Sequence, residues 1–425
     1  MLKSFGPALA CGLAGLSLAL SGLHFYRVRS PLGLALYPFK LLAGSLAAFL
    51  VGGGVLGALL GLWLRLPLAV AAGATGAALS GFCVYRVTAP HGPARPPRSA
   101  GPRRAPRKLS AQPRWERDVP FWTLAGRDRP LLCDIWRPPE GVSPTGLAIV
   151  YLHNSAWHLA DKDLWTRPLL GHLAAQGHVV MDVAYRLCPE VDLYGMLGDV
   201  RRAIAWLKAN AGRYGVRPER VVVAGASAGG HLALLAAYTP GHPDLTPAEL
   251  QGVDTTVRGV VSCYGLADML AFYRHMAGIL PSRKVFKWLE AGPLLNSLQW
   301  LADQVPGHPL ASQVGKLGGM SLPEMMASLL GGQPCERPAV YELASPITHA
   351  GAHCPPTLLI QGEHDIAAPP AAARALQRKL AASGVPATLV LLPYTDHMFD
   401  LLWPRVSPAV RAAWRELDRF LARLA

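Results

Sequence analysis

Aspartate and glutamate are missing from the first 115 residues of this 425-residue chain, although this section contains 13 lysines and arginines. Almost all of the formal net charge of +14 therefore belongs to it, and the remainder is nearly neutral, with 28 basic and 27 acidic residues. A nucleic-acid-binding domain carries its basic excess on the folded unit. The distribution therefore argues against nucleic acid as a partner of the main domain.

Cysteine is also scarce, with seven residues whose spacing matches neither a disulfide framework nor a metal site. An odd number of scattered cysteines argues against a small secreted domain held together by disulfides. His349, His353 and Cys354 lie close together in the sequence, and we interpret this as a coincidence within a loop. We expect no metal ion and no cofactor.

Three long apolar runs occupy the N-terminal section, at about Gly6–His24, Leu41–Leu64 and Leu68–Tyr85. Each approaches the roughly 20 residues that a helix needs to cross a bilayer. We therefore expect a multi-pass membrane region with three transmembrane helices over residues 1–88, followed by a Pro/Arg-rich linker over residues 89–113. A cleaved signal peptide is the alternative for the first run, but no small-residue cleavage site follows it.

The positions of the cations predict the orientation of this region. If the N-terminus is outside, ten lysines and arginines lie on the inner side, and only Lys3 and Arg65 lie outside. Cytoplasmic segments next to membrane helices are enriched in Lys and Arg. We therefore expect the following domain to face the cytoplasm, with the lipid bilayer as a partner of the basic linker.

Residues 114–425 alternate between strand-like and helical segments. Short runs of Val, Ile and Leu without polar alternation are typical of strands that helices bury on both faces. We expect strands at residues 121–124, 131–136, 147–153, 179–185, 221–226, 257–264, 356–361 and 388–392. This pattern predicts an α/β domain with a doubly wound, mostly parallel sheet.

The connection at about residues 265–355 is too long for a simple loop in a compact fold and contains three helical runs of its own. We expect it to form a helical cap over the edge of the sheet. A packing insertion without substrate contact is the alternative.

Residues 221–231 read VVVAGASAGGH, which predicts a strand, a sharp turn with Ser227 at its apex, and a helix. Such a nucleophile elbow requires Gly225 and Gly229, because the turn brings the backbone and the helix too close for a Cβ atom. It exposes the Ser227 hydroxyl and directs the Ala228 amide at the carbonyl under attack. A small-residue turn after any buried strand is the alternative interpretation of these residues.

A serine nucleophile needs a base, and it needs an acid that orients the base. In this type of sheet the acid and then the histidine follow the serine along the chain, each on a loop beyond a strand. Asp365 and His397 both follow strand-like runs and are therefore our predicted acid and base. Asp268 is the alternative acid and His364 the alternative base, whereas Asp396 is too near His397 in sequence to orient its ring.

Four motifs in a fixed order carry a resemblance to a known family. They are an HNSAW loop from His153 to Trp157, a YRLCPE segment at residues 185–190, the elbow at Ser227, and the final aspartate and histidine. This set resembles the hormone-sensitive-lipase-like group of α/β-hydrolase carboxylesterases, whose loop reads HGGGW, over roughly residues 115–425. The resemblance implies an α/β-hydrolase fold in which the predicted serine, aspartate and histidine form the catalytic triad.

The same resemblance implies that the amides of Ser155, Ala156 and Ala228 form the oxyanion hole. The chain departs from the family pattern here, since Asn154, Ser155 and Ala156 replace three glycines. Glycine leaves the backbone free to approach the substrate, and serine and alanine adopt left-handed geometry less readily than asparagine. A single misplaced donor would lower turnover about 100- to 1000-fold.

These observations predict a membrane-anchored serine hydrolase that cleaves carboxylic esters through an acyl-enzyme. We expect small or lipid-like acylated substrates, because the anchor holds the site near the bilayer. Two alternatives stay open: an amidase or arylformamidase with the same triad, and a catalytically silent hydrolase scaffold. The sequence leaves the acyl-chain length and the oligomeric state open.

Overall fold

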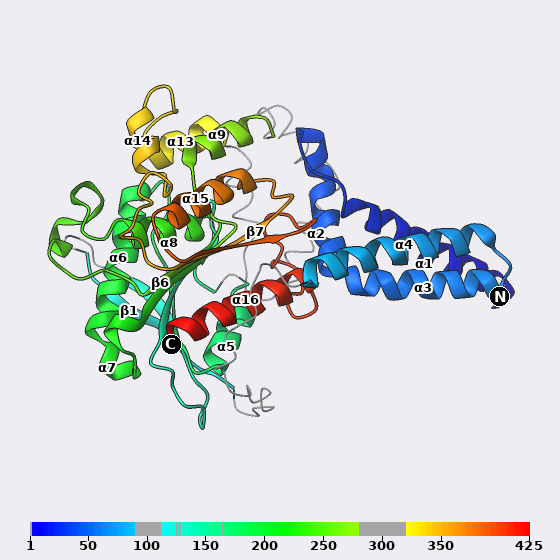
Figure 1. Ribbon diagram of the computed structural model, residues 1–425, viewed down its shortest axis with the longest axis horizontal. Helices are drawn as coiled ribbons and strands as arrows, with labels where there is room; N and C mark the ends of the chain where they lie inside the picture. The colour runs from blue at the N-terminus through cyan, green and yellow to red at the C-terminus, as the bar shows by residue number, and fades with distance from the viewer. Residues whose placement is uncertain (1, 90–111, 125, 127–128, 164, 280–319) are drawn as a thin grey trace.

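The computed structural model describes residues 2–89, 112–124, 126, 129–163, 165–279 and 320–425. It shows a bundle of helices that projects from an α/β domain (Figure 1). Most of the predicted linker at residues 89–113 lies outside the described residues.

An eight-stranded sheet forms the centre of the α/β domain, in the order β1-β2-β4-β3-β5-β6-β7-β8. The strands are β1 (Arg114–Trp122), β2 (Leu131–Arg137), β3 (Ala148–Leu152), β4 (Val179–Val183), β5 (Val221–Ala226), β6 (Gly259–Cys263), β7 (Thr357–Gly362) and β8 (Ala387–Leu392). Strand β2 is antiparallel to its neighbours β1 and β4, and every other pair is parallel. The carboxyl ends of the parallel strands therefore meet at one edge of the sheet.

Helices cover both faces of the sheet, because alternate side chains of each buried strand point to opposite faces. Val150 and Val223 pack into the core beneath α6, α8 and α15, whereas Ile149 and Val222 pack into the core beneath α5 and α16 (Figure 1). These helices are α5 (Arg167–Ala175), α6 (Leu193–Ala209), α8 (Ala228–Tyr238), α15 (Pro370–Ala382) and α16 (Pro408–Leu424), and a short α7 (Ala211–Tyr214) follows α6. The predicted doubly wound, mostly parallel sheet is confirmed.

The first strand differs from its prediction. The sequence predicts the first strand at residues 121–124. In the structure the first strand, β1, spans Arg114–Trp122 and lies at the edge of the sheet. Its exposed and half-buried positions include Arg114, Glu116 and Arg117, which an edge strand tolerates and a buried strand does not. A search for continuous apolar runs therefore missed most of it.

The expected cap is described only in part, since residues 280–319 lie outside the described residues and contain one of its three predicted helical runs. Its described helices are α9 (Met269–Ala277), α13 (Leu322–Leu330) and α14 (Pro338–Leu343), which lie together on one side of the domain (Figure 1). Phe272 of α9 contacts Trp157 edge-on, with ring centroids 5.6 Å apart. Helix α9 therefore lies over the loop that follows β3.

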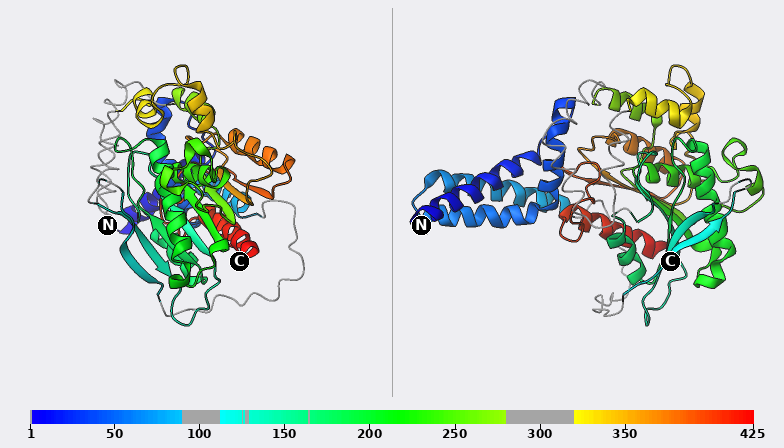
Figure 2. Two further views of the ribbon diagram at one scale, coloured as in Figure 1. Left: turned by 90° about the vertical axis from the view of Figure 1, so that its left-hand side faces the viewer. Right: turned by 180° about the vertical axis from the view of Figure 1, so that it is seen from behind.

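Residues 2–89 form four α-helices and a short 3-10 helix at Pro31–Leu36. The α-helices are α1 (Leu2–Leu23), α2 (Tyr37–Ser45), α3 (Ala47–Trp63) and α4 (Pro67–Thr88). Helices α1, α3 and α4 lie side by side and point away from the α/β domain, with the N-terminus at the far end (Figure 2). Helix α2 lies at the base of this bundle, next to the domain (Figure 1).

Two helices in the described part of the chain are long and apolar enough to cross a membrane, over Gly6–Leu23 and Pro67–Thr88. The middle predicted span, at Leu41–Leu64, is not a single straight helix. It is divided between α2 and α3, which reach the required length only as a pair and are bent by 81°. The bend follows from packing, because α2 is bonded to the α/β domain while α3 packs against α1 and α4.

Small residues bring the helices of the bundle into close contact, as is common in membrane helices. A Cβ atom on Gly73 would lie 2.5 Å from the carbonyl oxygen of Gly54, and one on Gly54 would lie 2.7 Å from Oγ of Ser17. Ser21 and Ser80 meet across the α1–α4 contact, with their hydroxyl oxygens 2.7 Å apart. The polar side chains thus satisfy one another inside an apolar bundle.

Gly73→Ala is expected to destabilise the bundle, because the added methyl group overlaps the backbone of α3. Overpacking of this kind costs about 1–3 kcal/mol. Gly52→Ala in α3 is the matched control, since a Cβ atom there meets nothing within 4 Å. Thermal unfolding of the detergent-solubilised protein measures both variants. Equal midpoints for the two variants would contradict the close packing.

Candidate active site

Strand β5 and helix α8 meet at Ser227, whose φ of 53° and ψ of −119° are strained for a residue with a side chain. A Cβ atom on Gly225 would lie 2.5 Å from the carbonyl oxygen of Gly229, and one on Gly229 would overlap the carbonyl oxygen of Leu152. The turn is therefore held by close backbone contact between β5, α8 and the end of β3. This packing is the physical reason for the two glycines that the sequence places around Ser227.

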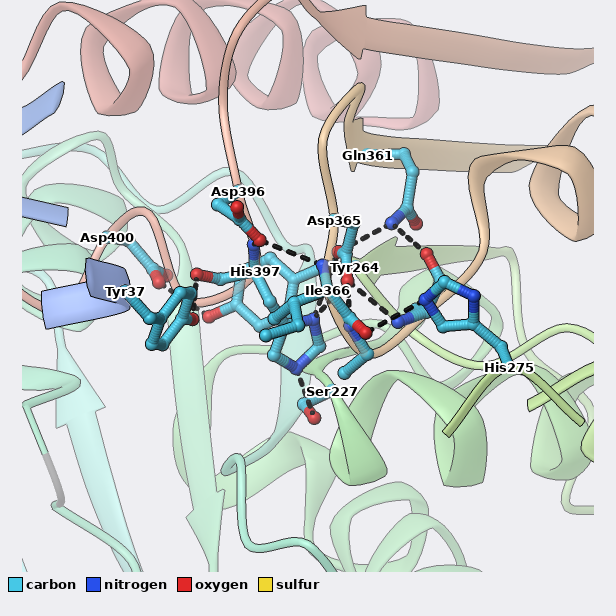
Figure 3. A network of polar contacts seen from close by, with 12 residues as sticks. Tyr37, Ser227, Tyr264, His275, Gln361, Asp365, Ile366, Asp396, His397 and Asp400 are labelled. Carbon is cyan, nitrogen blue, oxygen red and sulfur yellow. Dashed lines mark hydrogen bonds and ion pairs between the residues drawn. The ribbon is translucent and has the colours of Figure 1, made fainter. Parts of the chain in front are cut away.

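The structure brings the predicted serine, histidine and aspartate together (Figure 3). Ser227 Oγ does not cap α8 and instead lies 2.9 Å from Nε2 of His397. His397 Nδ1 lies 2.9 and 3.0 Å from the two carboxylate oxygens of Asp365. Because Nδ1 faces an acceptor, it carries the hydrogen, which leaves Nε2 free to accept the Ser227 proton.

The Asp365 carboxylate is buried and held by three further donors. Gln361, near the end of β7, donates to Oδ2 at 2.6 Å, and the amides of Ala367 and Ala368 donate to Oδ1 at 2.8 and 2.7 Å. These bonds offset the cost of burying a charge. They also orient the carboxylate toward the imidazole.

Burial alone would lower the pKa of His397, but the neighbouring carboxylates, Asp365 foremost, together outweigh burial and raise the pKa above the usual 6.5. Asp396 and Asp400 act in the same direction. Tyr264, which follows β6, packs edge-on against the imidazole with centroids 4.7 Å apart and donates a hydrogen bond of 2.5 Å to Asp400. The surroundings therefore stabilise the imidazolium that proton transfer from a serine produces.

The alternative acid and base occupy other positions. Asp268 caps α9, and its side chain accepts a hydrogen bond from the Ala271 amide at 2.9 Å. His364 Nδ1 lies 3.2 Å from Nζ of Lys40, and burial together with that cation lowers the pKa of His364 to about 3. The geometry therefore favours Asp365 and His397 over these alternatives.

The loop after β3 begins beside the elbow, because Leu152 of β3 pairs with Gly225 of β5. Within this loop Ala156 and Trp157 adopt positive φ values of 45° and 62°. The left-handed conformation thus falls on Ala156 and Trp157, and not on Asn154, the residue best suited to it. Such backbone strain costs on the order of 1–3 kcal/mol per residue and is frequent at functional sites.

Ser155 and Tyr185 brace this loop internally. Ser155 Oγ accepts from the Trp157 amide at 3.0 Å and lies 2.8 Å from the Tyr185 hydroxyl. Tyr185 donates to the carbonyl oxygen of His153 at 2.7 Å, and its ring stacks on His153 with centroids 4.4 Å apart. The predicted donor Ala228 is the first residue of α8, where the helix dipole favours negative charge.

The side chains of His349 and His353 form hydrogen bonds with backbone carbonyl groups. Their Nε2 atoms lie 2.8 Å from the Leu343 carbonyl oxygen and 2.9 Å from the Tyr238 carbonyl oxygen, respectively. No group of three or more metal-binding side chains is found among the residues that the structure describes.

Sequence analysis missed Gln361, Tyr264 and Lys40 as residues around the predicted acid and base. Lys40 forms an ion pair of 2.8 Å with Asp396, and both side chains are buried. A signal for Lys40 was present, because it is a lone cation at the start of an apolar run, and ionisable groups in such places commonly have a function. Gln361 and Tyr264 are polar residues near or beyond the ends of buried strands, which is a weaker signal.

Comparison with known proteins identifies the family. The sequence model of the BD-FAE family matches residues 133–305 and 312–380, which is more than half of the chain. The chain belongs to the BD-FAE family. The match begins within β2 and covers the elbow, and it includes Asp365 of the proposed triad.

Two relatives of this BD-FAE member come from Mycobacterium tuberculosis. "Probable carboxylic ester hydrolase LipM" is 30% identical over 271 residues, which cover 63% of this chain and 53% of the relative. "Esterase LipQ" is 26% identical over 287 residues, which cover 67% of this chain and 57% of the relative. The chain thus spans about half the length of these two curated relatives.

Solved structures share the fold of this BD-FAE member. Esterase Est2 from Thermogutta terrifontis aligns with a TM-score of 0.52 and 20% identity, covering 75% of this chain and 93% of the esterase. Esterase B from Lactobacillus rhamnosus aligns with a TM-score of 0.51 and 21% identity, covering 74% and 86%. The predicted α/β-hydrolase fold and the resemblance to α/β-hydrolase carboxylesterases are confirmed.

His397 is expected to titrate above pH 6.5, and Asp365→Asn is expected to lower its pKa, because burial then acts without the opposing carboxylate. NMR of protein with 13C-labelled histidine rings follows the titration, and His397→Gln identifies the resonance. A wild-type midpoint below 6.5, or the same midpoint in the Asp365→Asn protein, would contradict the described geometry.

Proposed function

We propose that this protein is a membrane-anchored serine hydrolase that cleaves carboxylic esters through an acyl-enzyme. The observation that carries the proposal is the continuous chain of hydrogen bonds from Ser227 through His397 to Asp365, each 2.9 Å long. The relatives are named as a probable carboxylic ester hydrolase and an esterase, which favours esters as the substrate class.

In the proposed mechanism, His397 Nε2 takes the hydroxyl proton as Ser227 Oγ attacks the ester carbonyl carbon. The tetrahedral intermediate collapses, the C–O bond to the alcohol breaks, and His397 returns the proton to the leaving alcohol. Water then attacks the acyl-enzyme with His397 again as the base, which releases the carboxylic acid and restores Ser227. Asp365 stabilises the imidazolium in both steps.

The negative charge on the carbonyl oxygen needs donors on the opposite side from the histidine. We assign this role to the amides of Ala228, Ser155 and Ala156. The position of Ala228 at the start of α8 and the pairing of β3 with β5 support the assignment. The methyl group of Ala156 occupies space that a glycine leaves open, which favours small acyl groups.

The proposed anchor consists of α1, the bent pair α2 and α3, and α4, within a membrane region over residues 1–88. The proposed linker follows at 89–113 and the hydrolase domain at 114–425. Because the N-terminus lies at the far end of the bundle from the hydrolase domain (Figure 2), the two lie on opposite sides of the membrane in this arrangement. The excess of cations next to the domain favours the cytoplasmic side for it.

Ser227→Ala is expected to lower the hydrolysis of p-nitrophenyl acetate, butyrate and octanoate by at least about 10⁴-fold, because no other hydroxyl occupies the elbow. Ser383→Ala is the control, since Ser383 bonds to the Lys379 carbonyl on α15. Equal activity of Ser227→Ala and wild type would refute the serine mechanism.

The same assays separate the alternatives. Faster cleavage of N-formyl aniline derivatives than of every ester would indicate an amidase or arylformamidase. A wild-type protein that turns over none of these compounds and resists a fluorophosphonate probe would indicate a silent scaffold.

A further inference from the structure

A buried ion pair joins the N-terminal helices to the loop that carries His397. Lys40 of α2 places Nζ 2.8 Å from Oδ2 of Asp396, and the two side chains are only 2% and 1% exposed. Lys40 also donates to the carbonyl oxygen of Tyr26 at 2.6 Å. Breaking one side of such a pair leaves an uncompensated buried charge, which is strongly unfavourable.

The other oxygen of Asp396 connects the loop after β7, which carries Asp365 (the acid loop), with the loop after β8, which carries His397 (the base loop). Oδ1 accepts hydrogen bonds from the amides of Ile366 and His397, each at 2.8 Å (Figure 3). Ile366 follows Asp365 directly, so the Asp396 carboxylate fixes the backbone beside the proposed acid and at the proposed base. Burial raises the pKa of the Asp396 carboxyl group, and the adjacent Lys40 cation acts against that rise.

Further contacts connect the N-terminal helices to the loop that carries His397. The Tyr37 hydroxyl donates to the carbonyl oxygen of His397 at 2.7 Å. The Tyr394 ring, three residues before His397, contacts Phe25, two residues beyond α1, and Phe82 of α4, with centroids 5.0 and 5.9 Å away.

An apolar cluster adds to these contacts on the acid loop. Val28 and Ile366 are both buried in it, and Tyr37 packs against it. The acid loop and the base loop are therefore both packed against the membrane region.

We propose that Lys40 and Tyr37 are positioning residues of the hydrolase site, so that the membrane region completes the active site as well as anchoring it. They hold the loops of Asp365 and His397 in the position that places Nε2 of His397 next to Oγ of Ser227. This inference rests on the proposed function and extends it. It predicts that a change in α2, outside the sheet that carries Ser227, impairs the chemical step.

The test measures ester hydrolysis by the full chain in detergent. Titration with a fluorophosphonate gives the concentration of active sites, and kcat is calculated per active site. Lys40→Met is expected to lower kcat about 100-fold, the effect of a misplacement of about 1 Å in a catalytic group, with little change in KM. Tyr37→Phe removes one hydrogen bond and is expected to lower kcat about 3- to 10-fold. Arg29→Met is the control, because it removes an exposed cation from the connection between α1 and α2. Its kcat is expected to match that of the wild type.

The double variant Lys40→Met/Asp396→Asn distinguishes positioning from general stability. It removes both charges and keeps an oxygen that accepts from the Ile366 and His397 amides, so kcat is expected to recover most of the loss. An unchanged kcat per site in Lys40→Met and in Tyr37→Phe would overturn the inference, whatever their melting temperatures. A loss that the double variant does not repair would also overturn it.

If Lys40→Met does not fold, Tyr37→Phe and the double variant decide the question by the same criteria. A parallel assay of Ser227→Ala separates this inference from the proposed function. Wild-type activity in Ser227→Ala would refute the serine mechanism itself, whereas wild-type activity in the α2 variants alone would refute only the role of the membrane region.

Discussion

Close backbone contact at the turn between β5 and α8 is the constraint on which the site depends. Gly225 and Gly229 let the turn approach the end of β3, and Ser227 takes up the resulting strain with a φ of 53°. The cost, on the order of 1–3 kcal/mol, is offset by strands and a helix that are buried on all sides. The hydroxyl is thereby held at the carboxyl edge of the sheet, where the loops after β7 and β8 begin.

The acid and the base reach this edge from loops, which are less rigid than strands, so their positions depend on additional contacts. Gln361 and two amides fix Asp365, and the Asp396 carboxylate ties the acid loop to the base loop. Lys40 of α2 then neutralises Asp396. In this arrangement the N-terminal helices and the α/β domain are not independent units, because a contact between them lies one residue from the proposed base.

The sequence predicted those features that depend on local patterns. Buried strands appear as apolar runs, and the order of Ser227, Asp365 and His397 follows from the topology of the sheet. Features that depend on distant contacts were missed: β1 carries an edge-strand pattern, the middle span bends where α2 bonds to the domain, and Lys40 meets Asp396 across 356 positions. The sequence shows that Asn154, Ser155 and Ala156 stand where the family has glycines, but the positive φ of Ala156 depends on the surrounding fold.

The most direct test of the central claim is to locate the covalent adduct formed by diethyl p-nitrophenyl phosphate. Ser227 attacks phosphorus, p-nitrophenolate leaves, and a diethylphosphoryl group stays on the protein. Peptide mass spectrometry is expected to show one such group on Ser227, in proportion to the activity lost. Complete inactivation with the group on any other residue would contradict the account.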